Sequence, residues 1–151
     1  MQLHWVLKKF EELTPYELYK ILQLRNAVFV VEQSCVFQDA DDKDQESYHL
    51  MGFEGNALVA YTRLLPPGLS YPQASIGRVV TATAVRRSGA GKELMAQSIH
   101  EVYKLFGKGA IKIGAQSYLK CFYESFGFVQ TGTPYLEDGI EHIYMIKEPQ
   151  S

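Results

Sequence analysis

The sequence predicts an α/β (α+β) fold, in which a mixed, mostly antiparallel sheet of about seven strands is flanked by helices. Three observations predict it. Strand patterns alternate with helix patterns, two pairs of strands meet at tight turns, and one Val-rich strand leads directly into a glycine-opened amphipathic helix. The chain has 151 residues, of which 46% are hydrophobic and 21% are charged. This length and composition indicate one globular domain over residues 1–151, with no room for a second.

The first elements are a strand and a capped helix. Residues 3–10 favour a strand. Thr14-Pro15-Tyr16-Glu17 is a capping box with proline at the first helical position, and it predicts a helix that runs towards Val28 or Phe29. Residues 30–47 lack a regular pattern and become acidic, so we expect an irregular segment there.

Two strands and a turn are predicted in the middle of the chain. Residues 48–54 and 57–65 are apolar runs on either side of Gly55-Asn56, which favours a hairpin. After a Pro-Pro-Gly break, residues 75–81 form a third strand.

The C-terminal part is predicted to contain a strand, a helix and a second hairpin. Residues 111–115 favour a short strand and residues 117–126 a helix. Strands at 129–136 and 140–146 are expected to form a hairpin around Asp138-Gly139. The resulting order is strand, helix, three strands, helix, strand, helix and two strands.

The most informative segment is the turn that enters the second long helix. The helical periodicity begins after Gly91 and is carried by Leu94, Met95, Ile99, Val102, Leu105 and Phe106. Arg86, Arg87, Ser88, Gly89, Ala90, Gly91 and Lys92 therefore surround a helix N-terminus. Unpaired backbone N–H groups, a positive helix dipole, glycines and three cationic side chains together favour an anion, so we predict a phosphate-binding site.

Two common phosphate-binding motifs do not fit this segment. A P-loop needs Gly-Lys-Ser/Thr, which is missing after the glycines. A dinucleotide-binding turn needs a third glycine, and Leu94 stands there instead. Glycines that open a helix for packing reasons alone remain an alternative.

Composition excludes several other classes of function. The net charge is −2 and the basic residues are scattered, which argues against nucleic acid as a partner. No apolar run has the length of a membrane span, and the start of the chain does not resemble a signal peptide. Cys35 and Cys121 have no metal-ligand spacing, so we expect no metal and a reduced, cytoplasmic setting.

A second motif, Gln116-Ser-Tyr-Leu-Lys-Cys-Phe-Tyr-Glu-Ser-Phe-Gly-Phe128, completes a pattern with the first. Arg86-x-x-Gly-x-Gly91 followed by Phe-Tyr-x-x-Phe-Gly-Phe resembles the GNAT acyltransferases. The stretches at 22–33, 76–80, 114–116 and 137–143 are similar to the ElaA-like subgroup of that family, so the resemblance covers nearly the whole chain. It implies the GNAT acyl-CoA N-acyltransferase fold.

The resemblance also implies a donor and its binding residues. Acetyl-CoA would be the co-substrate, with its pyrophosphate on the backbone amides of residues 87–92. Its pantetheine arm would run along the strand at 75–81 and use backbone groups of Val79 and Thr81. The amide of Val80 or Thr81 would polarise the thioester carbonyl, which stabilises an oxyanion without reorganisation. Gln116 stands where the family commonly has Asn, and it would contact the pantetheine or adenine side of CoA.

Four residues are candidates for proton transfer. Tyr123 matches the tyrosine that protonates the departing thiolate in many family members, and its alternative role is core packing. The base that accepts the amine proton is sought first at Glu32, then at His142 and Glu141, although a surface carboxylate or a core histidine would explain these residues equally.

The acidic run at residues 39–46 carries a charge of −4 but lacks the glycine and distal glutamate of a calcium loop. We expect a solvated loop, and a patch that attracts a cationic amine is the alternative. Arg25 would either pair with a nearby acid or line the acceptor pocket.

The function expected from these features is transfer of an acetyl (acyl) group from acetyl-CoA to a primary amine of a small molecule or peptide, by direct attack in a ternary complex. Two alternatives stay open: a non-catalytic CoA-binding regulatory module, and a GNAT-fold enzyme that uses a longer acyl donor. The resemblance also implies a possible homodimer.

Overall fold

The structure is a computed structural model that describes residues 2–149. The strands are β1 (His4–Lys9), β2 (Tyr48–Glu54), β3 (Ala57–Leu65), β4 (Ser75–Thr81), β5 (Ile111–Gln116), β6 (Phe128–Glu137) and β7 (Ile140–Lys147). The helices are α1 (Pro15–Arg25), the π-helix η2 (Asn26–Glu32), α2 (Ala90–Phe106) and α3 (Lys120–Glu124). Short 3₁₀ turns are η1 (Phe10–Glu12), η3 (Asp44–Glu46), η4 (Thr83–Val85) and η5 (Ser117–Leu119). The predicted order of strands and helices is confirmed.

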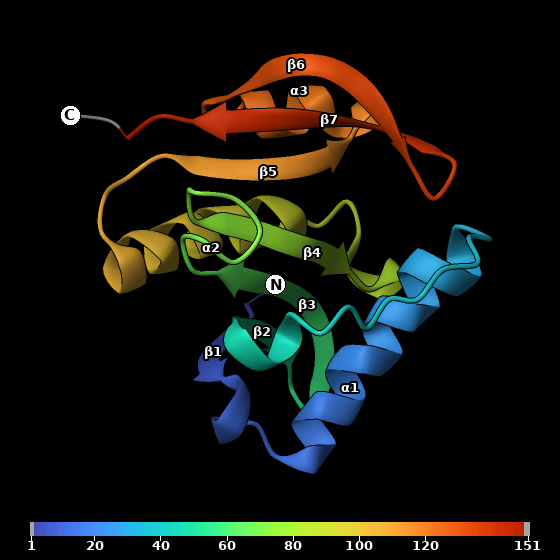
Figure 1. Ribbon diagram of the computed structural model, residues 1–151. Helices are drawn as coiled ribbons and strands as arrows, with labels where there is room; N and C mark the ends of the chain where they lie inside the picture. Colours follow the sequence, from blue (N-terminus) through green and yellow to red (C-terminus); the bar gives the residue numbers. More distant parts are fainter. Residues whose placement is uncertain (1, 150–151) are drawn as a thin grey trace.

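Two antiparallel sheets lie edge to edge, with strand orders β1-β2-β3-β4 and β5-β7-β6. They meet where β4 and β5 run parallel, at a single bridge between Ala74 and Ile111, and Lys112 N donates to Ala74 O at 3.0 Å. Beyond this bridge the two strands diverge (Figure 1). The C-terminal ends of β4 and β5 therefore lie apart.

Helices cover opposite faces of the larger sheet. On one face, Ile21 and Leu24 of α1 pack with Met51 and Tyr61. On the other face, Leu94 of α2 packs with the next residues along the same strands, Leu50 and Ala60. This alternation follows from the period of two in a strand, which sends successive side chains to opposite faces. Most of the remaining core lies between α2, α3 and the smaller sheet.

The local predictions agree closely with the structure. Both hairpins form, and the strands of the first one have the predicted bounds. Thr14 Oγ1 accepts from Glu17 N at 3.1 Å, and Glu17 Oε1 accepts from Thr14 N at 2.8 Å, so the capping box is confirmed.

The segment after α1 is more helical than predicted. α1 ends at Arg25, and η2 continues it with wide turns in which Gln33 N bonds Val28 O at 3.2 Å and Cys35 N bonds Val30 O at 3.1 Å. The β-branched valines of this segment disfavour an α-helix, which is why the sequence pattern indicated irregular structure. The predicted helix at 117–126 is also shorter and is split into η5 and α3.

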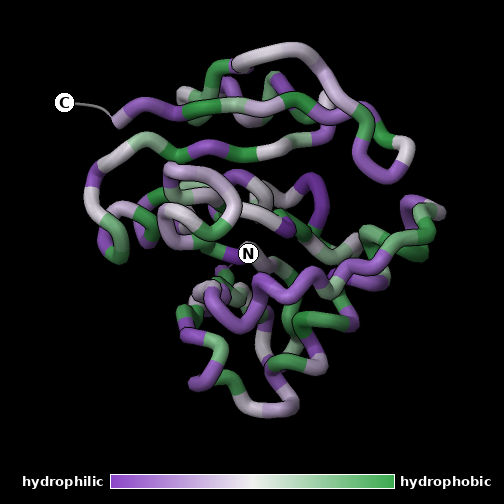
Figure 2. Tube along the Cα trace, in the orientation of Figure 1, coloured by the Kyte–Doolittle hydropathy of each residue, from purple (hydrophilic) through white to green (hydrophobic). Residues whose placement is uncertain are grey.

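The prediction that residues 39–46 form a solvated loop is wrong. This hydrophilic segment crosses in front of the sheet (Figure 2), and Asp39 and Asp44 are only 6% and 7% exposed. Arg25 is fully buried, and its guanidinium bonds Asp39 Oδ2 at 2.7 Å and Asp44 Oδ1 at 2.8 Å. Arg25 therefore pairs with acids, and these acids are not free to attract an amine.

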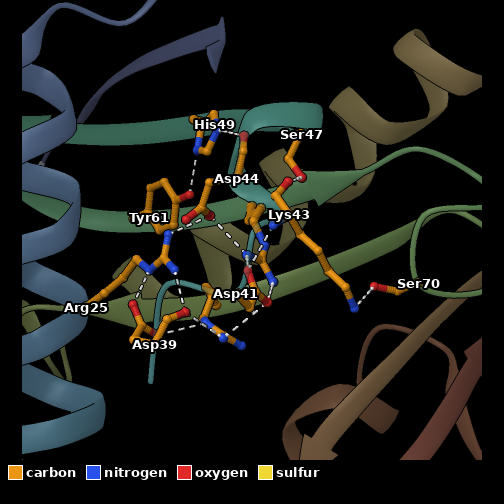
Figure 3. A network of polar contacts seen from close by, with 11 residues as sticks. Arg25, Asp39, Asp41, Lys43, Asp44, Ser47, His49, Tyr61 and Ser70 are labelled. Atoms are coloured by element: carbon orange, nitrogen blue, oxygen red, sulfur yellow. Dashed lines mark hydrogen bonds and ion pairs between the residues drawn. The ribbon is translucent and has the colours of Figure 1, made fainter. Parts of the chain in front are cut away.

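Two more arginines complete this network, part of which is labelled in Figure 3. Arg63 Nη1 lies 2.6 Å from Asp41 Oδ1, and Arg78 Nε lies 2.9 Å from Asp39 Oδ1. Burial alone would raise the pKa of Asp41, but hydrogen bonds from Arg63 and the charges of Arg63 and Arg78 outweigh it and lower this pKa. The three arginines come from α1, β3 and β4, so the network fixes the loop to the sheet.

Candidate active site

A cavity of about 510 Å³ lies in the opening between β4 and β5. Residues 76–81 of β4 and 113–116 of β5 form two of its walls. Side chains from η2, from α3 and from the β6–β7 hairpin close the other sides. Elements that are far apart in sequence thus meet at one end of both sheets.

β4 carries a bulge beside this cavity. Tyr61 pairs with Val80 and Arg63 with Gly77, so β4 has one residue more than β3 between these pairs. Arg78 sits there with a φ of 51°. A bulge takes backbone groups out of the ladder and bends the strand. Val79, Val80 and Thr81, which were predicted to contact the pantetheine arm or the thioester carbonyl, all line the cavity.

The predicted phosphate site lies at the N-terminus of α2. The turn that leads into it has left-handed backbone at Arg87 (φ 66°) and at Gly89 (φ 88°). The Glu93 N–H makes the helical bond back to Gly89 O at 3.1 Å, so the amides before it point out of the helix end. A Cβ added at Gly91 would meet nothing closer than a ring carbon of Phe122 at 3.9 Å, so the backbone here is open.

Arg86 and Glu32 line the cavity as an ion pair. Arg86 Nη2 donates to Glu32 Oε1 at 2.7 Å, and Nη1 donates to Oε2. The hydrogen bonds and charge of Arg86 lower the pKa of Glu32, and those of Glu32 raise the pKa of Arg86. A predicted base and a predicted CoA contact are therefore partners of each other.

Tyr123 extends from α3 to the same cavity. Only 5% of the residue is exposed, and burial raises the pKa of its phenol. Phe122 and Phe128 pack on it edge-to-face at ring distances of 5.2 and 6.0 Å. The phenol therefore stays protonated at neutral pH and is held in one orientation.

His142 and Gln116 are opposite each other on β7 and β5, and both line the cavity. His142 Nδ1 lies 2.8 Å from Ile140 O, and Nε2 lies 3.4 Å from a carboxylate oxygen of Glu137. Gln116 Nε2 donates to Gln33 Oε1 at 3.3 Å, which ties β5 to the segment after η2.

The structure brings most of the predicted site residues together. Glu32, Arg86, Gln116, Tyr123, His142 and residues 79–81 share the cavity, whereas residues 87–92 lie outside it at the helix end. Arg78, Phe37 and Glu137 also line it and were missed. The local sequence gave no signal for them, because their place at the cavity depends on the bulge and on the pairing of distant loops.

Within residues 2–149, no group of three or more His, Cys, Asp or Glu side chains is placed to hold a metal ion. In the same part of the chain, no helix has the length and apolar character needed to cross a membrane.

Comparisons with known proteins agree on one family. A sequence model described as an acetyltransferase (GNAT) domain matches residues 19–149. The crystal structure of an acyl-CoA N-acyltransferase from Pseudomonas aeruginosa is similar with a TM-score of 0.92 and 40% identity, over 97% of this chain and 99% of that one. Escherichia coli ElaA is similar with a TM-score of 0.91 and 38% identity, over 97% of this chain and 100% of that one. A UPF0039 protein from Synechocystis is 42% identical over 147 residues, 97% of this chain and 96% of that protein.

Proposed function

Because this chain belongs to the GNAT acetyltransferase family and is ElaA-like, we propose that it transfers an acetyl group from acetyl-CoA to a primary amine. The observation that carries the proposal is the shared cavity: the bulged strand β4, Arg86 of the Arg-x-x-Gly-x-Gly motif and the buried phenol of Tyr123 all line it. The motif's glycines continue from Arg86 to the N-terminus of α2, where exposed amides suit a pyrophosphate. The residues present therefore fit a CoA thioester.

The proposed reaction is direct transfer without an acyl-enzyme. The lone pair of a neutral amine attacks the thioester carbonyl carbon, so a C–N bond forms and the carbonyl oxygen becomes an oxyanion. When this intermediate collapses, the C–S bond breaks. Tyr123 gives its proton to the departing thiolate, and a base takes one proton from the nitrogen. A backbone N–H of Val80 or Thr81 would stabilise the oxyanion between these events. The products are the amide, CoA as the free thiol and, for an amine that arrives protonated, one proton released to water.

Of the predicted bases, His142 has the more suitable hydrogen bonds, and the exposed Glu141 is not among the residues that line the cavity. A carbonyl oxygen only accepts, so the 2.8 Å contact with Ile140 O favours a proton on Nδ1 and leaves the lone pair on Nε2. The carboxylate of Glu137, 3.4 Å from Nε2, is placed to pair with the ring once Nε2 takes a proton. Glu32 is paired with Arg86, which lowers its pKa and weakens it as a proton acceptor. Glu32 would act as the base only after Arg86 turned to another anion.

Ligand-dependent thermal stability tests the donor. Acetyl-CoA, desulfo-CoA and ATP are added separately at one common concentration, about 100 times the dissociation constant of acetyl-CoA. Binding at that level adds about 2.7 kcal/mol, which raises the Tm of a domain of this size by several degrees. Stabilisation by both CoA compounds and not by ATP is expected. If none of the three raises the Tm, the proposed donor site is wrong.

Turnover separates an enzyme from a non-catalytic CoA-binding module. Free thiol released from acetyl-CoA is followed with a panel of primary amines, and then with acyl-CoA donors of increasing chain length. An enzyme releases thiol faster with amine than without it. Binding of acetyl-CoA with no amine-dependent release would favour the regulatory module.

A further inference from the structure

A second cavity, of about 320 Å³, lies beside the first and shares part of its wall with it. Gly114 of β5 and Glu137 at the end of β6 line both cavities. Most of the other side chains that line the second cavity are polar or charged. Because it adjoins the proposed CoA cavity along Gly77 and Arg78 of β4 and Gly114 of β5, an acceptor bound there could reach the thioester.

Two phenols and a carboxylate meet at the end where the cavities join. A Cβ added at Gly114 would lie 2.6 Å from Tyr135 Oη and 3.2 Å from Tyr71 Oη, so this glycine is what lets both hydroxyls converge here. Burial and the charge of Glu137 both raise the pKa values of Tyr71 and Tyr135. Phenol and carboxylate oxygens accept hydrogen bonds, and together they suit an ammonium group.

A single lysine gives the second cavity a cationic wall away from this junction. Lys43 is half-buried, and its side chain leaves the arginine–aspartate network to reach Ser70 Oγ, to which Nζ donates at 2.9 Å (Figure 3). Arg63 and Arg78 also line this cavity, but aspartates contact both of them. Among residues 2–149, Lys43 is the lining cation without a carboxylate contact. Its ammonium has three N–H donors, and the serine takes one.

The oxygens of Tyr71, Tyr135 and Glu137 at one end and the ammonium of Lys43 at the other indicate the chemistry of the ligand. We propose that the second cavity binds the acceptor, and that this acceptor is a short primary amine carrying an anionic group such as a carboxylate. The amino group lies at Gly114, among Tyr71, Tyr135 and Glu137, next to the thioester. The anionic group lies at Lys43. A second positive charge at that end is disfavoured, since it would face the ammonium of Lys43. This inference rests on the proposed acyltransferase function.

A matched series of acceptors tests it. Monoamines, ω-amino carboxylates and diamines of the same chain lengths, from propyl to hexyl, are compared by thiol release at saturating acetyl-CoA and constant ionic strength. At the best chain length, the amino carboxylate is expected to exceed both partners by about tenfold in kcat/KM, the effect of one well-placed charged hydrogen bond.

Two variants test which residues bind the acceptor. Lys43→Met should reduce kcat/KM for the amino carboxylate to the value for the matched monoamine. Glu137→Gln should raise KM for every amine while leaving the Kd of acetyl-CoA unchanged. Lys108→Met, an exposed lysine in the turn after α2, is the matched control and should keep the preference. Circular dichroism and Tm confirm that each variant is folded.

Each outcome decides the question. Equal or better turnover of the monoamines or diamines overturns the proposal while leaving the acyltransferase function intact. If no amine reacts, the same amines are compared by their effect on the Tm of the acetyl-CoA complex, and equal shifts for all three classes overturn it. Failure of acetyl-CoA itself to bind is a separate result, and it counts against the proposed function.

Discussion

The guanidinium of Arg86 and the carboxylate of Glu32 form a two-point ion pair beside the larger cavity. It joins η2, which follows the first helix, to the turn that precedes α2. Both side chains are partly exposed, at 33% and 44%, so the pair is open to solvent and to ligands. If a phosphate-bearing ligand binds at the N-terminus of α2 and contacts Arg86, as proposed, it competes with Glu32 for this side chain.

We expect Glu32→Gln to tighten the binding of CoA. The substitution frees Arg86 and removes a negative charge that repels the ligand. Because exposed ion pairs are weak, the dissociation constant should fall only about two- to fivefold, measured by titration calorimetry at low salt. Glu11→Gln, an exposed carboxylate in the turn after β1, should have no effect. Unchanged or weaker binding of CoA by Glu32→Gln would mean that Arg86 does not contact the ligand.

Tyr123→Phe should slow turnover without weakening CoA binding. A general acid typically contributes about 10²–10⁴-fold, so kcat should fall within that range. Burial raises the pKa of the phenol above its ordinary value of about 10, so the proton is retained through neutral pH. The wild-type rate should therefore show no loss from Tyr123 ionisation below about pH 10. Retention of full activity by Tyr123→Phe would leave Tyr123 as a core residue.

Two glycine substitutions separate ligand binding from stability. Gly91 is inside α2, with room for a Cβ, so Gly91→Ala should stabilise the fold by up to about 1 kcal/mol. The same methyl group stands on the backbone that the pyrophosphate is proposed to approach, so CoA affinity should fall. Gly89→Ala should instead destabilise the fold by about 1 kcal/mol, because φ is 88° there. Unimpaired CoA affinity in Gly91→Ala would argue against the helix end as the phosphate site.

The pH dependence of the stability of Asp44→Asn should show what the charge of Asp44 contributes to the buried network. Burial raises the pKa of Asp44, but the hydrogen bonds and charges of Arg25 and Arg63 outweigh it, so the folded-state pKa is lowered. A carboxylate whose pKa is lower in the folded state than in the unfolded state stabilises the fold at pH values above its unfolded-state pKa of about 4. This stabilisation is lost as the pH falls through the folded-state pKa. Urea unfolding should therefore find the variant about 3 kcal/mol less stable at neutral pH, with the difference shrinking below about pH 4.

Asp42→Asn is the control for this measurement. Asp42 is exposed, and asparagine tolerates its φ of 65°. This variant should match the wild type at every pH. A deficit in Asp44→Asn that stays constant down to pH 2 would show that lost packing, rather than charge, is responsible.

Local chemistry was enough to predict most of the fold. The Thr14–Glu17 capping box, the hairpin turns at Gly55 and Asp138-Gly139, and the periodicity of α2 each depend on residues close together in sequence. The motif residues that resemble GNAT proteins added the arrangement of these parts, and the comparisons confirm that fold.

What could not be predicted depends on residues that are distant in sequence. The acidic run at 39–46 is polar by composition, yet Asp39 and Asp44 are buried because Arg25, Arg63 and Arg78 converge on the run from three elements. In the same way, the sequence around Gly114 does not show why a glycine stands there. Tyr71, from a loop, and Tyr135, from β6, place their hydroxyl groups where a Cβ at this position would lie. Composition gives the number of charged residues but does not show which residues they will contact in the fold.

The single parallel bridge between Ala74 and Ile111 also bears on the order of folding. β2, β3 and β4 follow one another as a meander, and β6 and β7 form a hairpin, so these pairings need only short loop closures. Joining the sheets needs a longer closure, across α2, and few backbone hydrogen bonds offset its entropy. We therefore expect the two halves to form early and separately, and the seam between β4 and β5 to close last. The part of the molecule that is proposed to do chemistry is then also the last to assemble and the first to open.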